Sequence, residues 1–206
     1  MPNLPAIPSP TCPFCSIAAA YPPIPPSSAI QKVPPRPGST ESSHAFLILS
    51  TQHVLAFLDI MPLARGHILL TSRNHWEKVG DVGVRVGEEF GKWLPVLSRT
   101  AMRVIFGAES LAEEQHWNIV QNNGERAAQV VPHIHFHIIP RPPLGSPGAM
   151  TKSPSWTMFG RGQREELDDE EGEELARRLR EELAREVGRV KQEEGIDLDV
   201  DIDHKL

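Results

Sequence analysis

Apolar residues along this chain gather into five short runs and two longer periodic stretches. The short runs have the length of strands and cover residues 44–50, 53–59, 66–71, 117–121 and 130–140. Residues 81–106 instead place apolar side chains at helical spacing, and Pro95 inside this stretch predicts a kink or two helical segments. The pattern therefore predicts five strands and a long helix.

The two ends of the chain have a different pattern. Twelve of the 20 prolines lie in the first 37 residues, so only a brief helix at residues 14–20 is expected there. Residues 21–43 are rich in Pro and Ser, which predicts a long surface loop or insertion. Residues 173–194 favour a helix with one narrow apolar stripe, which predicts a solvated helix laid on the body. Residues 196–203 alternate apolar and acidic residues, as an edge strand or a frayed acidic tail would.

Charge divides the chain more sharply than its average suggests. The formal net charge is −6, but residues 163–206 hold 17 acidic and 8 basic residues, a net charge of −9, which leaves +3 for residues 1–162. We therefore expect three parts: an N-terminal segment with the Pro-rich loop (1–43), a core (44–162), and an acidic C-terminal helix and tail (163–206).

Composition also excludes several classes of protein. The overall acidity argues against a dedicated nucleic-acid binder, and no apolar run approaches the roughly 20 residues that a membrane span needs. The first ten residues lack the pattern of a signal peptide, so we expect a cytoplasmic and/or nuclear protein without a membrane partner. In that setting the pair Cys12 and Cys15 indicates half a metal site or a redox pair.

The segment from His133 to Ile139 carries the strongest chemical signal. In a strand, alternate residues share a face, so His133, His135 and His137 project together while the intervening apolar residues face a core. Three imidazoles on one face need hydrogen-bond partners or a metal. Two chemistries fit: a three-histidine zinc site, or a nucleophilic imidazole whose neighbours bind an anion. The strand alone does not decide between them.

The residues around this strand resemble the histidine triad (HIT) family of nucleotide hydrolases and transferases. The resemblance covers about residues 12–156 and rests on these motifs: His-φ-His-φ-His-φ-φ at 133–139, Asn-Asn-Gly at 122–124 with Gln129, Phe-Leu-Asp-Ile at 57–60 with Gly66-His67, and Cys-Pro-Phe-Cys at 12–15. It implies an α+β HIT-like fold: an antiparallel sheet of about five strands with a long helix packed on it. The charged C-terminal helix would be an addition to that fold.

The same resemblance implies a role for each matching residue. His135 would attack the α-phosphorus of a nucleotide and form a covalent nucleotidyl-histidine, while His137 would bind the phosphate oxygens and His133 would sit behind the nucleophile. Asp59 would bind the ribose hydroxyls. The remaining substrate contacts would be Asn122 and Gln129 at the phosphate, Phe14, Ile17, Phe57, Leu58 and Ile60 around the base and ribose, and Trp156, which would reach the partner subunit's site.

A structural zinc is implied as well. Its ligands would be Cys12, Cys15, His75 and His133, and no catalytic metal is expected. The alternative is a pair of free thiols. The chain departs from the family's usual residues at three positions: Ala128 replaces Gly, Val130 replaces Ser or Thr, and Ser72 replaces Pro. His67 matches a family position to which we assign a structural role.

These matches favour the phosphoramidase branch, which cleaves the P–N bond of AMP-linked amines and forms homodimers. We therefore expect an enzyme that acts on purine nucleotides of the AMP type, works as a homodimer and binds no nucleic acid. The alternatives are a dinucleoside polyphosphate hydrolase of the same family and a nucleotide-binding regulatory protein with little turnover.

Overall fold

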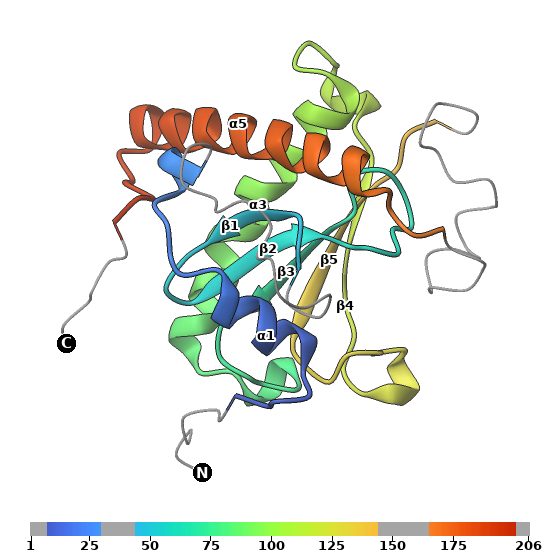
Figure 1. Cartoon of the computed structure of the whole chain (residues 1–206). Helices are drawn as coiled ribbons and strands as arrows, with labels where there is room; N and C mark the ends of the chain where they lie inside the picture. The colour runs from blue at the N-terminus through green and yellow to red at the C-terminus, as the bar shows by residue number, and fades with distance from the viewer. Residues whose placement is uncertain (1–7, 30–43, 144–164, 201–206) are drawn as a thin grey trace.

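A single antiparallel sheet forms the centre of the molecule (Figure 1). The computed structural model describes residues 8–29, 44–143 and 165–200. The sheet has five strands in the order β1-β2-β3-β5-β4. Their bounds are Leu47–Ser50 (β1), Val54–Leu58 (β2), Ile68–Ser72 (β3), Trp117–Gln121 (β4) and His135–Pro140 (β5). The predicted sheet is confirmed.

Helices cover both faces of this sheet. Two long helices, α3 (Val84–Phe106) and α5 (Asp169–Glu193), lie over one face, and the short α1 (Pro13–Ala20) lies over the other (Figure 1). Four short 3-10 turns complete the described structure: Pro26–Ser28 (η1), Val79–Asp81 (η3), Ala112–Glu114 (η4) and Glu125–Ala127 (η5). No helix in the described ranges is long and apolar enough to cross a membrane.

The alternation of side chains along the strands creates two separate cores. The larger core lies between the sheet and the helices α3 and α5 and contains Leu58, Leu70 and Ile138. The smaller core lies beneath α1 and contains Leu55, Phe57 and Leu69. Since paired residues of antiparallel strands share a face, the register places His135 and His137 on the α1 side.

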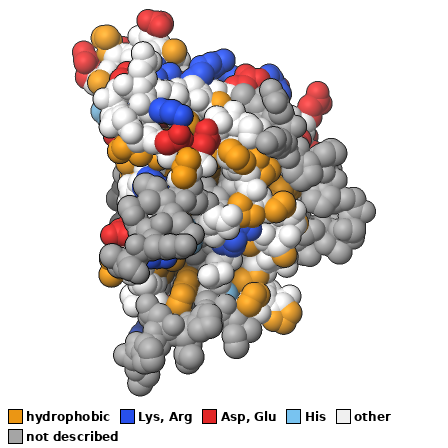
Figure 2. All heavy atoms as spheres, turned by 90° about the vertical axis from the view of Figure 1, so that its left-hand side faces the viewer, with side chains coloured by type: hydrophobic (Ala, Val, Ile, Leu, Met, Phe, Trp, Pro, Cys, Tyr) orange, Lys and Arg blue, Asp and Glu red, His pale blue; other side chains and the backbone are white. Residues whose placement is uncertain are grey.

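Helix α5 is an integral layer of the fold, which corrects the expectation of a solvated helix. Its apolar stripe lies in the larger core and consists of Leu175, Leu179, Leu183, Val187 and Val190. Arg180 donates a hydrogen bond to the carbonyl of Leu47 at 2.6 Å, and Asp168 caps the helix by accepting from the amides of Glu170 and Glu171. The outward face is polar, and charged side chains of both signs gather there (Figure 2).

The structure refines three local predictions for identifiable reasons. Helix α3 is one continuous element, because Pro95 lies on its exposed face and the carbonyl that loses its donor belongs to the exposed Gly91. Strand β5 begins only at His135, because Pro132 lacks an amide proton and the His133 amide donates to the Val131 carbonyl in a tight bend. The described residues 196–200 contain a turn and no strand, so of the two alternatives the edge strand does not hold for them.

A glycine in the first turns of α5 makes close packing possible. A Cβ on Gly172 would lie 2.5–2.7 Å from the ring atoms of the buried Phe46. We therefore expect Gly172→Ala to lower the free energy of unfolding by about 1–2 kcal/mol, since overpacking outweighs the gain in helix propensity. Urea unfolding measures this. The control is Gly188→Ala in the same helix, where nothing lies within 4 Å and a small stabilisation is expected. Equal effects of the two variants would contradict the packing argument.

Candidate active site and metal centre

His135 and His137 are two positions apart on β5, and both lie on the face of the sheet that α1 covers. His137 pairs with Leu69, and His135 pairs with Thr71. The two imidazole centroids are 4.8 Å apart. Phe14 of α1 covers His135, with its ring 5.3 Å from that of His135 in an edge-to-face contact. Helix and sheet together form a partly buried site with two adjacent imidazoles.

The protonation of His135 is set by its backbone partner. Its Nδ1 lies 2.7 Å from the carbonyl oxygen of His133. A carbonyl only accepts, so Nδ1 carries the proton and Nε2 keeps its lone pair. Burial lowers the pKa of His135, and the bond to the His133 carbonyl offsets part of this effect. At neutral pH the side chain is therefore an uncharged imidazole with a nucleophilic Nε2.

His137 has the opposite tautomer, and His67 is the cause. His67 is buried, and its Nε2 lies 2.9 Å from Nδ1 of His137. The amide of Leu63 donates to Nδ1 of His67 at 3.1 Å, so the proton of a neutral His67 is on Nε2. Nδ1 of His137 then accepts that proton's hydrogen bond. A neutral His137 consequently carries its own proton on Nε2, as a donor.

Asp59 lies next to His67 and so extends the series of contacts that ends at His137. Its Oδ2 lies 3.3 Å from Nδ1 of His67, and its Oδ1 accepts from the amide of Met61 at 2.9 Å. The carboxylate of Asp59 and the amide of Leu63 therefore both lie beside Nδ1 of His67, and Nε2 of His67 faces His137. Sequence reasoning gave His67 only a structural role. The signal was available, because the β2–β3 hairpin returns His67 to the end of the strand that precedes Asp59.

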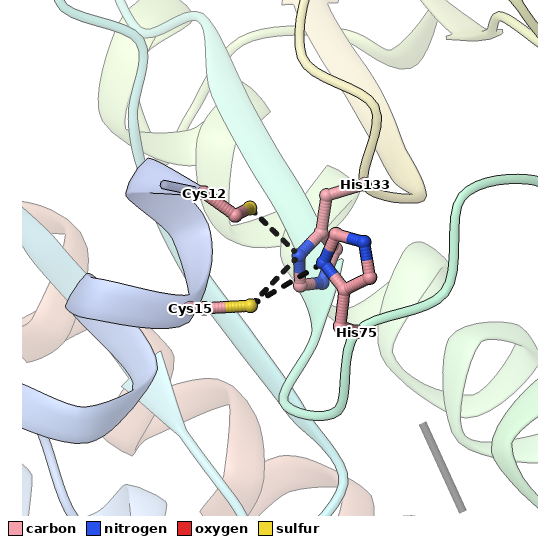
Figure 3. A group of neighbouring side chains, drawn as sticks. All are labelled: Cys12, Cys15, His75 and His133. Atoms are coloured by element: carbon pink, nitrogen blue, oxygen red, sulfur yellow. Dashed lines mark hydrogen bonds between the residues drawn. The ribbon is translucent and has the colours of Figure 1, made fainter. Parts of the chain in front are cut away.

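Cys12, Cys15, His75 and His133 converge at the N-terminal end of α1 (Figure 3). Cys12 Sγ lies 3.4 Å from His133 Nδ1, and Cys15 Sγ lies 3.8 Å from the same nitrogen. Cys15 Sγ is also 3.3 Å from Nδ1 of His75. The sequence prediction that these four side chains come together is confirmed.

This donor set fits a zinc ion in charge, composition and size. Two thiolates and two imidazoles are a common closed zinc shell, and the S···N edges of such a tetrahedron measure about 3.6 Å, close to the observed separations. Nε2 of His133 donates to the Ser72 carbonyl at 2.9 Å, which leaves the lone pair on Nδ1. Burial is the main reason that the pKa of His133 falls to about 4, so this nitrogen is unprotonated at neutral pH. Nδ1 of His133 thus has a lone pair and is unprotonated at neutral pH, as a metal ligand must be.

Gln129 organises the loop that precedes β5. Its Oε1 accepts from the Gly124 amide, and its Nε2 donates to the carbonyls of Glu77 at 2.7 Å and His133 at 3.4 Å. Asn122 is half-buried directly after β4. Val130, which lacks the hydroxyl of the family's usual residue, is 90% exposed at the surface of this loop. The phosphate contacts expected of Asn122 and Gln129 stay predictions.

The apolar residues predicted around the base and ribose divide into three groups. Phe14, Ile17 and Phe57 lie together in the smaller core beneath α1. Leu58 was assigned wrongly, because adjacent strand residues point to opposite faces and its side chain is in the larger core. Ile60 follows the strand and is 51% exposed. Trp156, which was predicted to reach the partner subunit's site, lies outside the described residues.

Arg73 is a positioning residue that sequence reasoning missed. Its guanidinium donates to the carbonyls of Ala18 and Tyr21, at 2.7 and 3.1 Å, and thereby holds the C-terminal end of α1. A further bond runs from its Nε to the carbonyl of Thr51 at 2.9 Å. Nothing in the local pattern marks this arginine, because its partners are backbone carbonyls distant in sequence.

The loop beside the site contains a strained residue. Ala128 has φ +63°, and it is the only described residue other than glycine with a positive φ. Because this region is unfavourable for a residue with a Cβ, we expect Ala128→Gly to raise the free energy of unfolding by about 1 kcal/mol. Chemical denaturation measures the change. Ala127→Gly, the exposed neighbour in η5, should instead be destabilising, and a gain there would contradict the explanation.

Comparison with known proteins gives consistent matches. The model of the HIT domain matches residues 40–144. The adenosine 5'-monophosphoramidase HNT1 of Candida albicans is 32% identical over 97 residues, which are 47% of this chain and 62% of that protein. The chain thus spans about three fifths of this relative.

Two solved structures extend the likeness to the fold. A zinc-bound histidine triad family protein from Mycobacterium smegmatis aligns with a TM-score of 0.56 and 25% identity, covering 85% of this chain and 94% of that one. A histidine triad nucleotide-binding protein from Sulfolobus tokodaii aligns with a TM-score of 0.58 and 21% identity, covering 89% and 97%.

Proposed function

The chain belongs to the HIT domain family, and from that premise we propose that it hydrolyses AMP-linked substrates at the α-phosphate, with phosphoramidates as the preferred class. The observation that carries this proposal is the hydrogen bonding of two adjacent imidazoles, His135 Nδ1 to the His133 carbonyl and His137 Nδ1 to His67. These contacts assign a free lone pair to Nε2 of His135 and a donor to Nε2 of His137. The name of the relative from Candida albicans supports the choice of phosphoramidates.

The reaction would proceed in two displacements. Nε2 of His135 attacks the α-phosphorus and forms a P–N bond, while the bond to the substrate's amine breaks. The Nε2–H of His137 donates a hydrogen bond to the phosphate oxygens, and the departing nitrogen takes its proton from solvent. The Nδ1–H of His135 stays bonded to the His133 carbonyl, which stabilises the cationic ring of the intermediate. Water then attacks phosphorus and loses a proton to solvent, and AMP leaves as His135 regains its lone pair.

A substrate panel tests this proposal. The full chain is incubated with an adenosine phosphoramidate, a diadenosine polyphosphate and a nucleotide sugar, and release of AMP is followed by chromatography. We expect fastest release from the phosphoramidate. Preference for the diadenosine compound would instead indicate a dinucleoside polyphosphate hydrolase. Tight AMP binding without release from any compound would indicate a regulatory binding protein.

We also propose that the Cys12, Cys15, His75 and His133 cluster holds a structural zinc. Its sulfur and nitrogen separations, its burial and the zinc-bound relative from Mycobacterium smegmatis support this assignment. The bound ion would fix α1 against β5 and the loop after β3, with no part in activating water. About one zinc per chain is expected by elemental analysis after purification without chelator, and less than a trace would contradict the assignment.

A homodimer is part of the same proposal. Strand β4 ends the sheet among the described residues, and its Trp117 and Ile119 are 42% and 46% exposed. An apolar edge strand of this kind offers a surface on which a second copy could continue the sheet. We expect light scattering to give the mass of a dimer and Ile119→Lys to give that of a monomer. A monomeric wild-type chain would contradict this part.

A further inference from the structure

The start of α1 contributes residues to both the metal cluster and the surroundings of the proposed catalytic centre. Cys12 is the N-cap residue of α1 and Cys15 lies in its first turn, with Phe14 between them. The ring of Phe14 makes edge contacts with His133 at 5.7 Å, His135 at 5.3 Å and Phe57 at 5.4 Å. Any displacement of the two cysteines therefore moves the ring that covers the proposed nucleophile.

His133 provides a second connection between the two centres. Its imidazole Nδ1 faces Cys12 Sγ at 3.4 Å, whereas its carbonyl oxygen accepts the Nδ1 proton of His135 at 2.7 Å. One residue thus offers a ligand atom to the metal and holds the tautomer of the proposed nucleophile. It stands outside the strand, since β5 begins at His135, so the ladder of the sheet does not fix its position.

The two ends of α1 are anchored unequally. At the C-terminal end, Arg73 donates to the Ala18 and Tyr21 carbonyls, and the Tyr21 hydroxyl donates to the Ala45 carbonyl at 3.1 Å. At the N-terminal end, Cys12 makes no side-chain cap hydrogen bond, and the cysteine side chains contact the histidines only through weak sulfur–nitrogen bonds. The turn that bears Phe14 is the end that a metal would secure.

We propose that metal occupancy of this cluster controls nucleotide affinity, by fixing the turn of Phe14 and the backbone of His133. This inference rests on the proposed function, because it requires that AMP binds beside His135. Coupling between two sites is reciprocal, so the nucleotide must tighten metal binding by the same factor by which the metal tightens nucleotide binding.

Calorimetry with AMP on the zinc-loaded and metal-free full chain measures one side of this cycle. We expect the dissociation constant of AMP to be about tenfold lower with zinc bound, within the usual range of such couplings. Competition with a chromogenic chelator measures the other side, without any turnover. The zinc affinity should rise about tenfold when AMP is present.

Two variants test whether the coupling between zinc and AMP passes through the turn of Phe14 in α1. Phe14→Leu keeps all four ligands but removes the aromatic contacts, and it should reduce the tenfold ratio to about threefold or less. Tyr21→Phe alters the end of α1 that Arg73 holds, and it should leave the ratio unchanged. A full tenfold ratio in Phe14→Leu would overturn the route through α1.

The outcomes separate the inference from the function on which it rests. Equal AMP affinity with and without zinc would overturn the coupling while the proposed function stands. Failure of the chain to bind zinc would also overturn the coupling. Binding of AMP to neither form would contradict the proposed function itself.

Discussion

Replacing His135 with alanine is expected to reduce AMP release from an adenosine phosphoramidate by at least about 10³-fold. The variant loses the atom that would form the bond to phosphorus. No other imidazole in the site can substitute for it, because Nδ1 of His137 accepts from His67 and the ring of His133 faces the two cysteines. Steady-state kinetics with the phosphoramidate measure the loss.

The control for this variant is the same substitution at an exposed histidine. His116 lies just before β4 and its side chain is exposed, so His116→Ala should keep the wild-type rate. Circular dichroism and the melting temperature of His135→Ala show whether the fold survives. A folded His135→Ala variant with more than a tenth of the wild-type activity would contradict the assignment of the nucleophile.

A second, independent measurement follows the intermediate itself. Rapid quenching of the wild-type reaction in denaturant at alkaline pH should leave AMP attached to the chain, detected as a mass increase on the peptide that contains His135. The linkage should be labile in acid, as phosphorus–nitrogen bonds to histidine are. Label on another residue would move the nucleophile to that residue.

The alternation of apolar and polar residues predicted the sheet and the shared face of His135 and His137, because both depend on a period of two. The predicted strand was too long at its start, because Pro132 and a bend precede His135, yet the ring of His133 still lies on the α1 side beside Phe14. The family resemblance, not the alternation, was wrong for Leu58: it placed Leu58 with Phe57, although neighbours in a strand face opposite cores.

Long-range backbone contacts were the least accessible to sequence reasoning. The role of Arg73 depends on carbonyls of α1 and of the turn after β1, and no spacing rule links those positions. The many charged residues of α5 favoured the prediction of a solvated helix, although its five apolar side chains at helical spacing indicated a buried face. A narrow stripe suffices here because Gly172 lets the helix approach Phe46 closely.

The second large effect is expected at His67, a residue that does not contact the proposed position of the substrate. His67→Phe fills the same buried space but removes the hydrogen bond to Nδ1 of His137. His137 could then place its proton on either nitrogen, and the donor at Nε2 would be lost for part of the population. We expect kcat to fall about 10²-fold, the usual cost of removing one hydrogen-bond donor that stabilises charge in the transition state, with little change in KM.

Rescue distinguishes this positioning role from simple packing. In His67→Gln the amide nitrogen can occupy the place of Nε2 and donate to His137, so we expect most of the lost kcat to return. A packing role predicts the opposite order, because phenylalanine matches the imidazole ring better than the flexible glutamine does. If His67→Phe were as active as wild type, the tautomer of His137 would have to be set by other groups. The hydrogen bond from His67 would then have no part in the reaction.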